Sequence, residues 1–210
     1  MTETERKKPW STRKKAFLVL LVIASGAIIV LTVLGGYTPF YRTFLQAEKM
    51  PYYADHIKGV EGIEYVARIN EGLYRGAYPK ENLDQLKKLG VKTIINLRYL
   101  KVHDYSGEAR AAGFEYYWMP INPPKPPDKK FVEKFLSIVT DQSKQPVYFH
   151  CTMGIDRTGL MAGIYRIEED GWSNEKAVAE MEYFGHNELW HDLEETLKTY
   201  TGPESYKHSD

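Results

Sequence analysis

The residues best suited to chemistry lie in one segment, His150–Gly159, which reads HCTMGIDRTG. Cys151 is the only cysteine among 210 residues, and Arg157 follows it six positions later. The segment comes after the apolar run 146–150 and before a helical pattern, so we expect a tight loop between a strand and a helix. Such a loop directs backbone N–H groups inward and forms a cradle for an anion at the positive end of the helix dipole.

Cys151 and Arg157 indicate what this cradle would hold and which reaction it would support. An arginine offers a planar fork that matches two oxygens of a phosphate group. A helix N-terminus and a nearby cation also favour the thiolate, which is the nucleophilic form of cysteine. A lone cysteine before a helix can be only a small buried apolar residue, but the spacing of Arg157, Gly154 and Thr158 favours a nucleophile beneath a bound phosphate.

The segment HCTMGIDRTG resembles the HCx5R(S/T) signature loop of the cysteine-dependent protein tyrosine and dual-specificity phosphatases. The stretches LYRGAYP, VKTIINLR and YRIEEDGW and a proline-rich loop also resemble bacterial dual-specificity-type members. The resemblance implies a phosphocysteine mechanism that needs no metal or other cofactor. In that mechanism Cys151 attacks phosphorus, Arg157 and the loop amides hold the equatorial oxygens, and water hydrolyses the thiophosphate.

The same resemblance implies roles for the residues around the nucleophile. Thr158 is expected to donate a hydrogen bond to the cysteine sulfur, and His150 to hold the loop and tune the thiol. The expected phosphate-binding residues are the loop positions that follow the nucleophile: Thr152, Met153, Gly154, Ile155, Asp156 and Arg157.

The general acid has two candidates. Dual-specificity members usually carry it upstream, after a Trp-Pro-type turn, but the comparable stretch 118–123 reads WMPINP and has no carboxylate. Asp156 is favoured, because its loop resembles those of secreted bacterial tyrosine and lipid phosphatases and of myotubularins, in which a loop aspartate is implicated. Asp128, at the end of the proline-rich segment, is the alternative and could instead cap a helix. Either residue would have to be protonated when substrate is bound.

Four other polar residues are given structural roles. Arg98 is expected to pair with Glu108 or to reach substrate, and Arg75 to make a scaffold contact. His186 and His191 are not part of a set with metal-ligand spacing, so they are expected to be helix-cap or surface groups.

The elements that must position these residues alternate between strands and helices. We expect strands at 63–69, 73–78, 91–97, 114–121 and 146–150, with helices near 83–89, 129–139, 157–169, 174–183 and 188–200. This order predicts a single α/β phosphatase domain over residues 63–210, with a central sheet flanked by helices.

The N-terminal part has a different pattern. Residues 1–15 carry six basic and two acidic side chains, and residues 16–36 carry no charge. A helix over this uncharged run would be about 31 Å long, which suits a bilayer core. We therefore expect a basic cytoplasmic tail, one transmembrane signal anchor and a juxtamembrane linker at 37–62. A cleaved signal peptide is the rival interpretation.

The charge distribution then predicts the location, and the resemblance implies the class of substrate. The positive-inside rule places the N-terminus in the cytoplasm and the catalytic domain on the periplasmic side of the inner membrane. Lys plus Arg and Asp plus Glu number 28 each, so the chain as a whole is not suited to coating nucleic acid. The expected substrates are phosphorylated proteins; phosphoinositides or inositol phosphates are the alternative, as is a pseudophosphatase that binds phosphate without turnover.

Overall fold

The computed structural model describes residues 53–101, 104–122, 125–186 and 188–202. Within them six strands form one mixed sheet in the order β1-β2-β3-β6-β4-β5. β1, β2 and β3 pair antiparallel, whereas β3, β6, β4 and β5 run parallel. The strand bounds are β1 Asp55–His56, β2 Ala67–Asn70, β3 Leu73–Gly76, β4 Thr93–Asn96, β5 Glu115–Trp118 and β6 Val147–His150.

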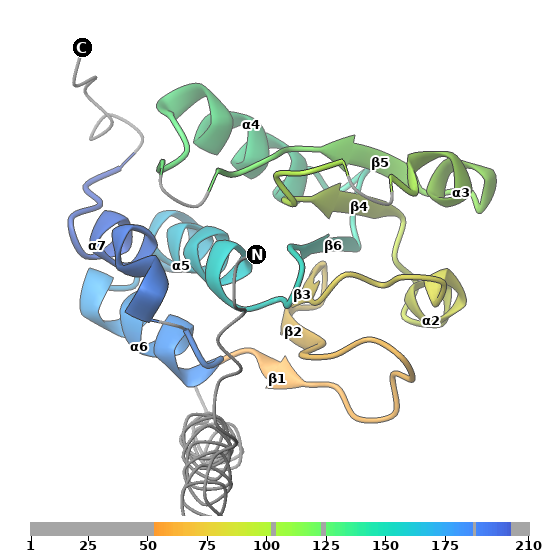
Figure 1. Cartoon of the computed structure of the whole chain (residues 1–210), viewed down its shortest axis with the longest axis horizontal. Coiled ribbons are helices and arrows are strands. Elements are labelled where there is room, and N and C mark those ends of the chain that lie inside the picture. Colours follow the sequence, from red (N-terminus) through yellow and green to blue (C-terminus); the bar gives the residue numbers. More distant parts are fainter. Residues whose placement is uncertain (1–52, 102–103, 123–124, 187, 203–210) are drawn as a thin grey trace, which may run out of the picture. The chain divides into compact units, whose positions relative to one another are not determined.

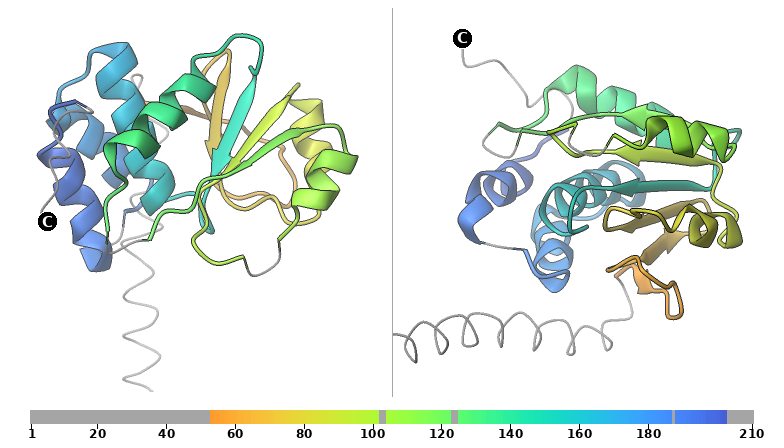
Figure 2. Two further views of the ribbon diagram at one scale, coloured as in Figure 1. Left: turned by 90° about the horizontal axis from the view of Figure 1, so that it is seen from above. Right: turned by 45° about the vertical axis from the view of Figure 1, so that its right-hand side comes forward.

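The helices cover both faces of the sheet (Figures 1 and 2). Successive side chains of a strand point to opposite faces, so each strand serves two cores. Ile95 and Phe149 join the larger core with α4–α7, and Ile94 and Tyr148 join the smaller core with α2 and α3. The helix bounds are α2 Leu83–Lys88, α3 Ser106–Ala111, α4 Lys129–Val139, α5 Asp156–Asp170, α6 Asn174–Tyr183 and α7 His191–Lys198, with a 3-10 turn at Glu188–Trp190.

The carboxyl ends of three parallel strands lie side by side at one end of the sheet. In the register of the sheet, His150 at the end of β6 lies beside Gly76 on β3 and Asn96 on β4. All residues of β4 and β6 are buried, as expected for parallel strands covered on both faces. The chemistry-bearing loop therefore starts where ligands usually bind to α/β sheets, outside the carboxyl ends of the strands.

The predicted α/β architecture with a helix-flanked sheet is confirmed, and the helix expected at 174–183 is present as α6. Some boundaries differ. The folded part begins ahead of residue 63, because β1 lies in the expected linker and pairs with β2. The strand expected at 63–69 starts only at Ala67, the six-residue α3 was not expected, and the helix expected at 188–200 is divided into a 3-10 turn and α7.

The predicted membrane location is corrected. No helix in the described part of the chain is long and apolar enough to cross a bilayer. Even α5, with 15 residues, falls short of the roughly 20 that a span requires. This finding contradicts the expected position of the catalytic domain on the periplasmic side of the inner membrane, which we do not retain. The expected tail 1–15 and span 16–36 lie outside the described residues.

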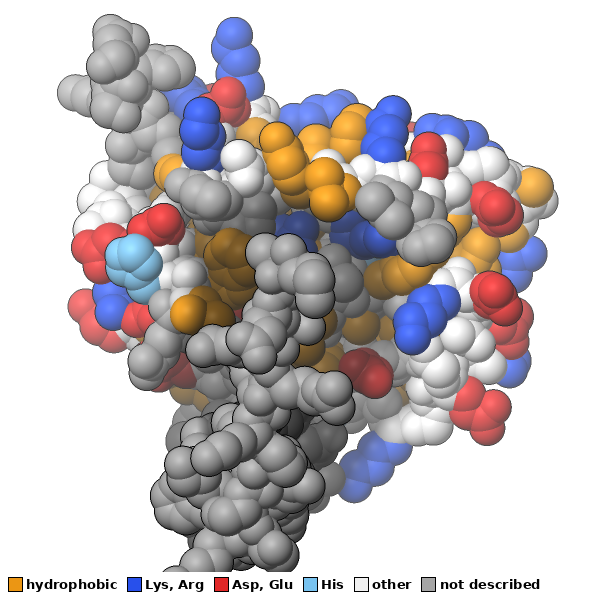
Figure 3. All heavy atoms as spheres, in the orientation of Figure 1, with side chains coloured by type: hydrophobic (Ala, Val, Ile, Leu, Met, Phe, Trp, Pro, Cys, Tyr) orange, Lys and Arg blue, Asp and Glu red, His pale blue; other side chains and the backbone are white. Residues whose placement is uncertain are grey.

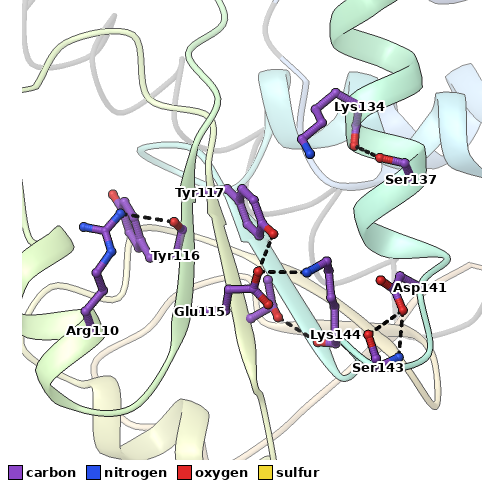
Figure 4. A network of polar contacts seen from close by, with 10 residues as sticks. Arg110, Glu115, Tyr116, Tyr117, Lys134, Ser137, Asp141, Ser143 and Lys144 are labelled. Atoms are coloured by element: carbon purple, nitrogen blue, oxygen red, sulfur yellow. Dashed lines mark hydrogen bonds and ion pairs between the residues drawn. The ribbon is translucent and has the colours of Figure 1, made fainter.

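The amino-terminal edge of the parallel strands is joined by an exposed polar network (Figure 4). Lys144, just before β6, donates to Glu115 at the start of β5 over 2.8 Å, and the Tyr117 hydroxyl donates to the same carboxylate. Both members of the ion pair are partly exposed, with 25% and 46% of their side chains accessible, so water screens their attraction. This network stabilises the edge opposite to the loop.

Helix α5 packs closely against α6 and α7 because it presents glycines to them. A Cβ atom at Gly159 would lie 2.8 Å from Met181 Cγ, and one at Gly163 only 2.5 Å from Leu197 Cδ2. Met181 and Leu197 are fully buried, so neither has free space to move into. The close packing of α5 on α6 and α7 thus requires glycine at both positions.

We expect alanine at two helical glycines to have opposite effects on stability. Gly107 in α3 has open space around it, so Gly107→Ala should raise the free energy of unfolding by about 0.5–1 kcal/mol. Gly163→Ala gains the same helix propensity but overpacks the contact with Leu197. Its free energy of unfolding should therefore be about 1–3 kcal/mol lower than that of Gly107→Ala. Urea unfolding of both variants measures the difference, and equal stabilities would contradict the close packing of α5 on α7.

Candidate active site

Cys151 lies at the carboxyl end of β6 and begins the loop that leads into α5. Its side chain is 2% exposed, and it is a free cysteine. The preceding strand end is fixed on one side by the amide of Leu97, which donates to the His150 carbonyl over 2.8 Å. Helix α5 then begins at Asp156, so the strand, loop and helix expected from the sequence are present.

Gly154 allows the loop to sit directly on the end of β3. Its φ of +77° is in the left-handed region, which glycine adopts at no steric cost. A Cβ atom there would lie 2.4 Å from the carbonyl carbon of Gly76 and 2.5 Å from the amide of Ala77. Both are backbone atoms of the sheet, so no other residue fits without displacing the loop.

The carbonyl oxygens of the loop are bound by donors from the protein below. Cys151 O accepts from His150 Nδ1 over 2.8 Å, Thr152 O accepts from the Tyr78 amide over 3.2 Å, and Gly154 O accepts from Arg75 Nη2 over 3.1 Å. In a planar trans peptide, the C=O of one residue and the N–H of the next point in opposite directions. The N–H groups that follow these three carbonyls are therefore turned away from the scaffold, as an anion cradle requires.

Arg75 is a fully buried cation beneath this loop. Its guanidinium carbon lies 3.7 Å from the centre of the Phe184 ring. Burial lowers the pKa of Arg75 to about 10, an effect that the charges of Glu180 and Cys151 partly offset. The side chain therefore stays charged at neutral pH and adds positive potential near the cysteine. The expected scaffold contact is thus a contact with the loop itself.

His150 is a neutral histidine with a defined tautomer. Burial lowers its pKa to about 3, with a further contribution from Arg98 and Arg157, although the hydrogen bond to Cys151 O opposes the change. Because a carbonyl only accepts, Nδ1 carries the proton and Nε2 is the acceptor. The Tyr105 hydroxyl therefore donates to Nε2. Burial also raises the pKa of Tyr105 well above its ordinary value, which keeps it a donor.

Arg157 and the outer loop residues are the accessible part of the site. Arg157 Nη2 donates to Thr152 Oγ1 over 3.3 Å, so the guanidinium lies across the loop. Thr152 is exposed, and Met153 is 50% exposed at the rim. Ile155, in contrast, is buried and precedes the first residue of α5.

Thr158 differs from its expected role. Its hydroxyl is buried and has no hydrogen-bond partner among the described residues, so the expected bond to the Cys151 sulfur is not formed. A helical threonine divides between two side-chain rotamers, and the bond would need a rotation about Cα–Cβ.

The two candidate acids are in different environments. Asp156 belongs to the first turn of α5, and its Oδ1 lies 2.8 Å from Nδ1 of His186. Asp128 is exposed and caps α4, since its side chain accepts from the Phe131 amide over 2.8 Å. The structure thus places Asp156 within the loop-to-helix segment and gives Asp128 its capping role.

His186 corrects the expectation of a cap or surface group, because its side chain is only 2% exposed. Its contact with Asp156 joins residues that are thirty positions apart, so no local sequence pattern predicts it. His191, by contrast, is a surface residue with 76% of its side chain exposed. In the described residues no group of three or more His, Cys, Asp or Glu side chains could hold a metal ion.

Two hollows share Tyr78 and Lys80 in their linings. One, of about 610 Å³, also includes Thr152 and Met153 of the loop. The other has about 690 Å³ and extends toward Asp104 and Tyr105. Arg98 is buried against Tyr78, with its guanidinium carbon 4.1 Å from the ring centre. Figure 3 shows Lys and Arg side chains recessed between apolar ones near the middle of the face seen in Figure 1.

Comparison with known proteins gives one family match. The family model described as "DSP-PTPase phosphatase fused to NAD+ Kinase" matches residues 58–196. This range contains the whole loop segment 151–157 and both candidate acids.

The proteins that are similar in sequence include two phosphatases. The chain is 27% identical over 169 residues to the dual specificity protein phosphatase TpbA of Pseudomonas aeruginosa, covering 80% of this chain and 74% of that protein. It is 32% identical over 107 residues to the inositol diphosphatase DSP3 of Arabidopsis thaliana, covering 47% of this chain and 51% of that protein.

Solved structures share the fold. The crystal structure of P. aeruginosa TpbA matches with a TM-score of 0.63 and 24% identity, covering 72% of this chain and 92% of that chain. A further TpbA structure is a complex with phosphotyrosine. The catalytic core of the PP-IP phosphatase Siw14 from S. cerevisiae, solved with citrate, matches with a TM-score of 0.57 and 20% identity, covering 68% and 89% of the two chains.

The neutral His150 predicts a specific loss of stability in acid. The unfolded chain takes up this proton near pH 6.5, but the folded protein does so only near pH 3. Acidification between these values therefore favours the unfolded chain by about 1.4 kcal/mol per pH unit. In His150→Gln, the fall in unfolding free energy between about pH 6.5 and pH 5 should be smaller than in the wild type by about 2 kcal/mol.

Urea unfolding at the two pH values measures this difference. The matched control is His191→Gln, which changes an exposed histidine and should keep the wild-type pH dependence. If His150→Gln loses as much stability in acid as the wild type, His150 is not neutral in the folded protein.

Proposed function

The chain belongs to the family described as a DSP-PTPase phosphatase fused to NAD+ kinase, and from this membership we propose that it hydrolyses phosphomonoesters through a phosphocysteine intermediate. It is a cysteine-dependent phosphatase. The observation that supports the proposed mechanism best is the loop from Cys151 to Arg157, whose carbonyls are bound from below. We also propose that the catalytic domain starts ahead of residue 63, because β1 belongs to its sheet.

In the proposed first step, the Cys151 thiolate attacks phosphorus and forms an S–P bond while the P–O bond to the leaving group breaks. The loop N–H groups and Arg157 hold the three other oxygens, on which negative charge builds up. Asp156, protonated at this stage, gives its proton to the departing oxygen.

In the second step, water attacks phosphorus, and the Asp156 carboxylate accepts its proton. The S–P bond breaks, inorganic phosphate is released, and the electron pair returns to sulfur as the thiolate. Positive potential from the buried Arg75 would stabilise that thiolate. Thr158 would assist by rotating its unpartnered hydroxyl toward the sulfur.

Asp156 is the better candidate for the acid because it is already part of the loop-to-helix segment. It is 16% exposed, so it is partly shielded from water but still accessible to a bound ester. Asp128 would have to give up its hydrogen bond to the Phe131 amide, and with it the cap of α4, which contributes about 1 kcal/mol.

Phosphotyrosine-type protein substrates fit the surroundings of the loop best. Among the described residues that line the two hollows, Lys80 is the one basic side chain, whereas four are acidic: Glu64, Glu81, Asp104 and Glu108. An inositol bearing many phosphates would meet repulsion there. The similarity to TpbA agrees with this choice, while the similarity to DSP3 keeps inositol phosphates as the alternative substrates.

We expect Cys151→Ser to abolish hydrolysis of p-nitrophenyl phosphate, because a serine hydroxyl is a far weaker nucleophile than a thiolate at neutral pH. Glu115→Gln, at the opposite edge of the sheet, is the control and should retain wild-type turnover. No cysteine-dependent turnover by the wild type across about pH 5 to 8 would instead support a phosphate-binding pseudophosphatase. A panel of phosphotyrosine peptides, phosphoinositides and inositol phosphates then identifies the substrate class.

The two candidate acids are separated by leaving-group dependence. Asp156→Asn should lower kcat for phenyl phosphate by roughly 10²- to 10⁴-fold, and that for p-nitrophenyl phosphate much less, because nitrophenolate leaves without a proton. Asp128→Asn keeps a good helix cap and should leave both rates unchanged. A selective loss in Asp128→Asn, with none in Asp156→Asn, would reverse the assignment.

A further inference from the structure

His186 is a buried histidine that the phosphocysteine mechanism does not use. It follows the end of α6, and its ring lies between carboxylates from two other helices. Nδ1 is 2.8 Å from Asp156 Oδ1 on α5, and Nε2 is 3.6 Å from Glu194 Oε2 on α7. The shorter distance is a hydrogen bond, whereas the longer one exceeds hydrogen-bond length.

The surrounding helices hold His186 in this place. Its backbone amide donates to Met181 O at the end of α6 over 3.3 Å. Met181 in turn packs against Gly159 of α5, one turn after Asp156. Glu194 is itself paired with Lys198 on α7. In the part of the chain that the structure describes, the charged groups that contact His186 are Asp156, Glu194 and, through Glu194, Lys198.

The hydrogen bond distinguishes the two oxygens of Asp156. An ionised carboxylate only accepts, so Nδ1 of His186 carries the hydrogen of the 2.8 Å contact. Because Oδ1 already accepts from this donor, Oδ2 is the favoured position for a proton added to Asp156. A carboxylic acid whose Oδ1 accepts and whose Oδ2 donates has a single orientation for proton transfer.

From this geometry we propose that His186 is a positioning residue: its Nδ1–H engages Oδ1 of Asp156, so that Oδ2 is the oxygen that gives the proton to the leaving group. The inference rests on the proposed function, with Asp156 as the general acid. The proton transfers balance over the two steps of the catalytic cycle. Oδ2–H protonates the leaving oxygen in the first step, and Oδ2 takes a proton from water in the second, while His186 keeps its own proton throughout.

The kinetic experiment compares leaving groups in His186→Ala. We expect kcat for phenyl phosphate to fall about 10-fold or more, while kcat for p-nitrophenyl phosphate and both KM values change less than about 3-fold. His186→Asn offers an amide N–H in place of Nδ1–H and should restore part of the loss. The matched control is His191→Ala, in which an exposed histidine is removed and neither rate should change.

The double variant His186→Ala/Asp156→Asn separates positioning from an independent effect. If His186 acts through Asp156, its removal should add nothing to Asp156→Asn with phenyl phosphate. Equal losses on both substrates in His186→Ala, or a further loss in the double variant, would overturn the proposal and leave His186 a structural residue.

A measurement without turnover keeps this test apart from the test of the proposed function. In Cys151→Ser protein labelled with nitrogen-15 at histidine, the Nδ1 resonance of His186 should be that of a protonated nitrogen, and Asp156→Asn should shift it. An unprotonated Nδ1 would overturn the inference even if the enzyme turns over. If Nδ1 is protonated in this spectrum but the wild-type protein shows no turnover, the contact between His186 and Asp156 is supported and only the catalytic function is rejected.

Discussion

The hydrogen bonds that bind three carbonyl oxygens of the loop are the constraint on which the site depends. Each comes from a different part of the fold: the side chain of His150 on β6, the backbone of Tyr78 after β3 and the guanidinium of Arg75 within β3. Together they orient the peptide planes, and the planes orient the N–H groups. Close contact of Gly154 with the backbone of β3 makes this possible, because a side chain there would lift the loop from its donors.

The helical half of the molecule provides the second part of the site. Helix α5 carries Asp156 and Arg157 in its first turn and contacts both α6 and α7. Glycines at two of these contacts bring the helices close together. As a result His186 meets Asp156 of α5 on one side and Glu194 of α7 on the other. In the proposed mechanism, binding of the phosphate therefore depends on the sheet, whereas delivery of a proton depends on how the C-terminal helices pack.

Local patterns predicted the parts of this arrangement that are local. The loop segment that carries Cys151 and Arg157, helix α6 and the capping by Asp128 all follow from residues within a few positions of one another. Contacts between distant segments were not predictable in this way: Arg75 and Gly154 are separated by 79 residues, and Tyr105 and His150 by 45. Helix α3 was not predicted, because it has only six residues and one of them, Ala109, is buried. One buried position does not produce a detectable helical period in the sequence. The predicted membrane location was wrong for the part of the chain that the structure describes.

Arg75 has an energetic consequence for the protein as a whole. Two of its nitrogens, Nε and Nη1, have no hydrogen-bond partner among the described residues, and burying such a group costs stability. An apolar side chain of similar size would suit the same interior better. The fold therefore gives up stability for a positive potential that is in place before any anion arrives. An anion bound in the loop returns part of that loss, so unfolding of this phosphatase and release of its ligand are linked equilibria.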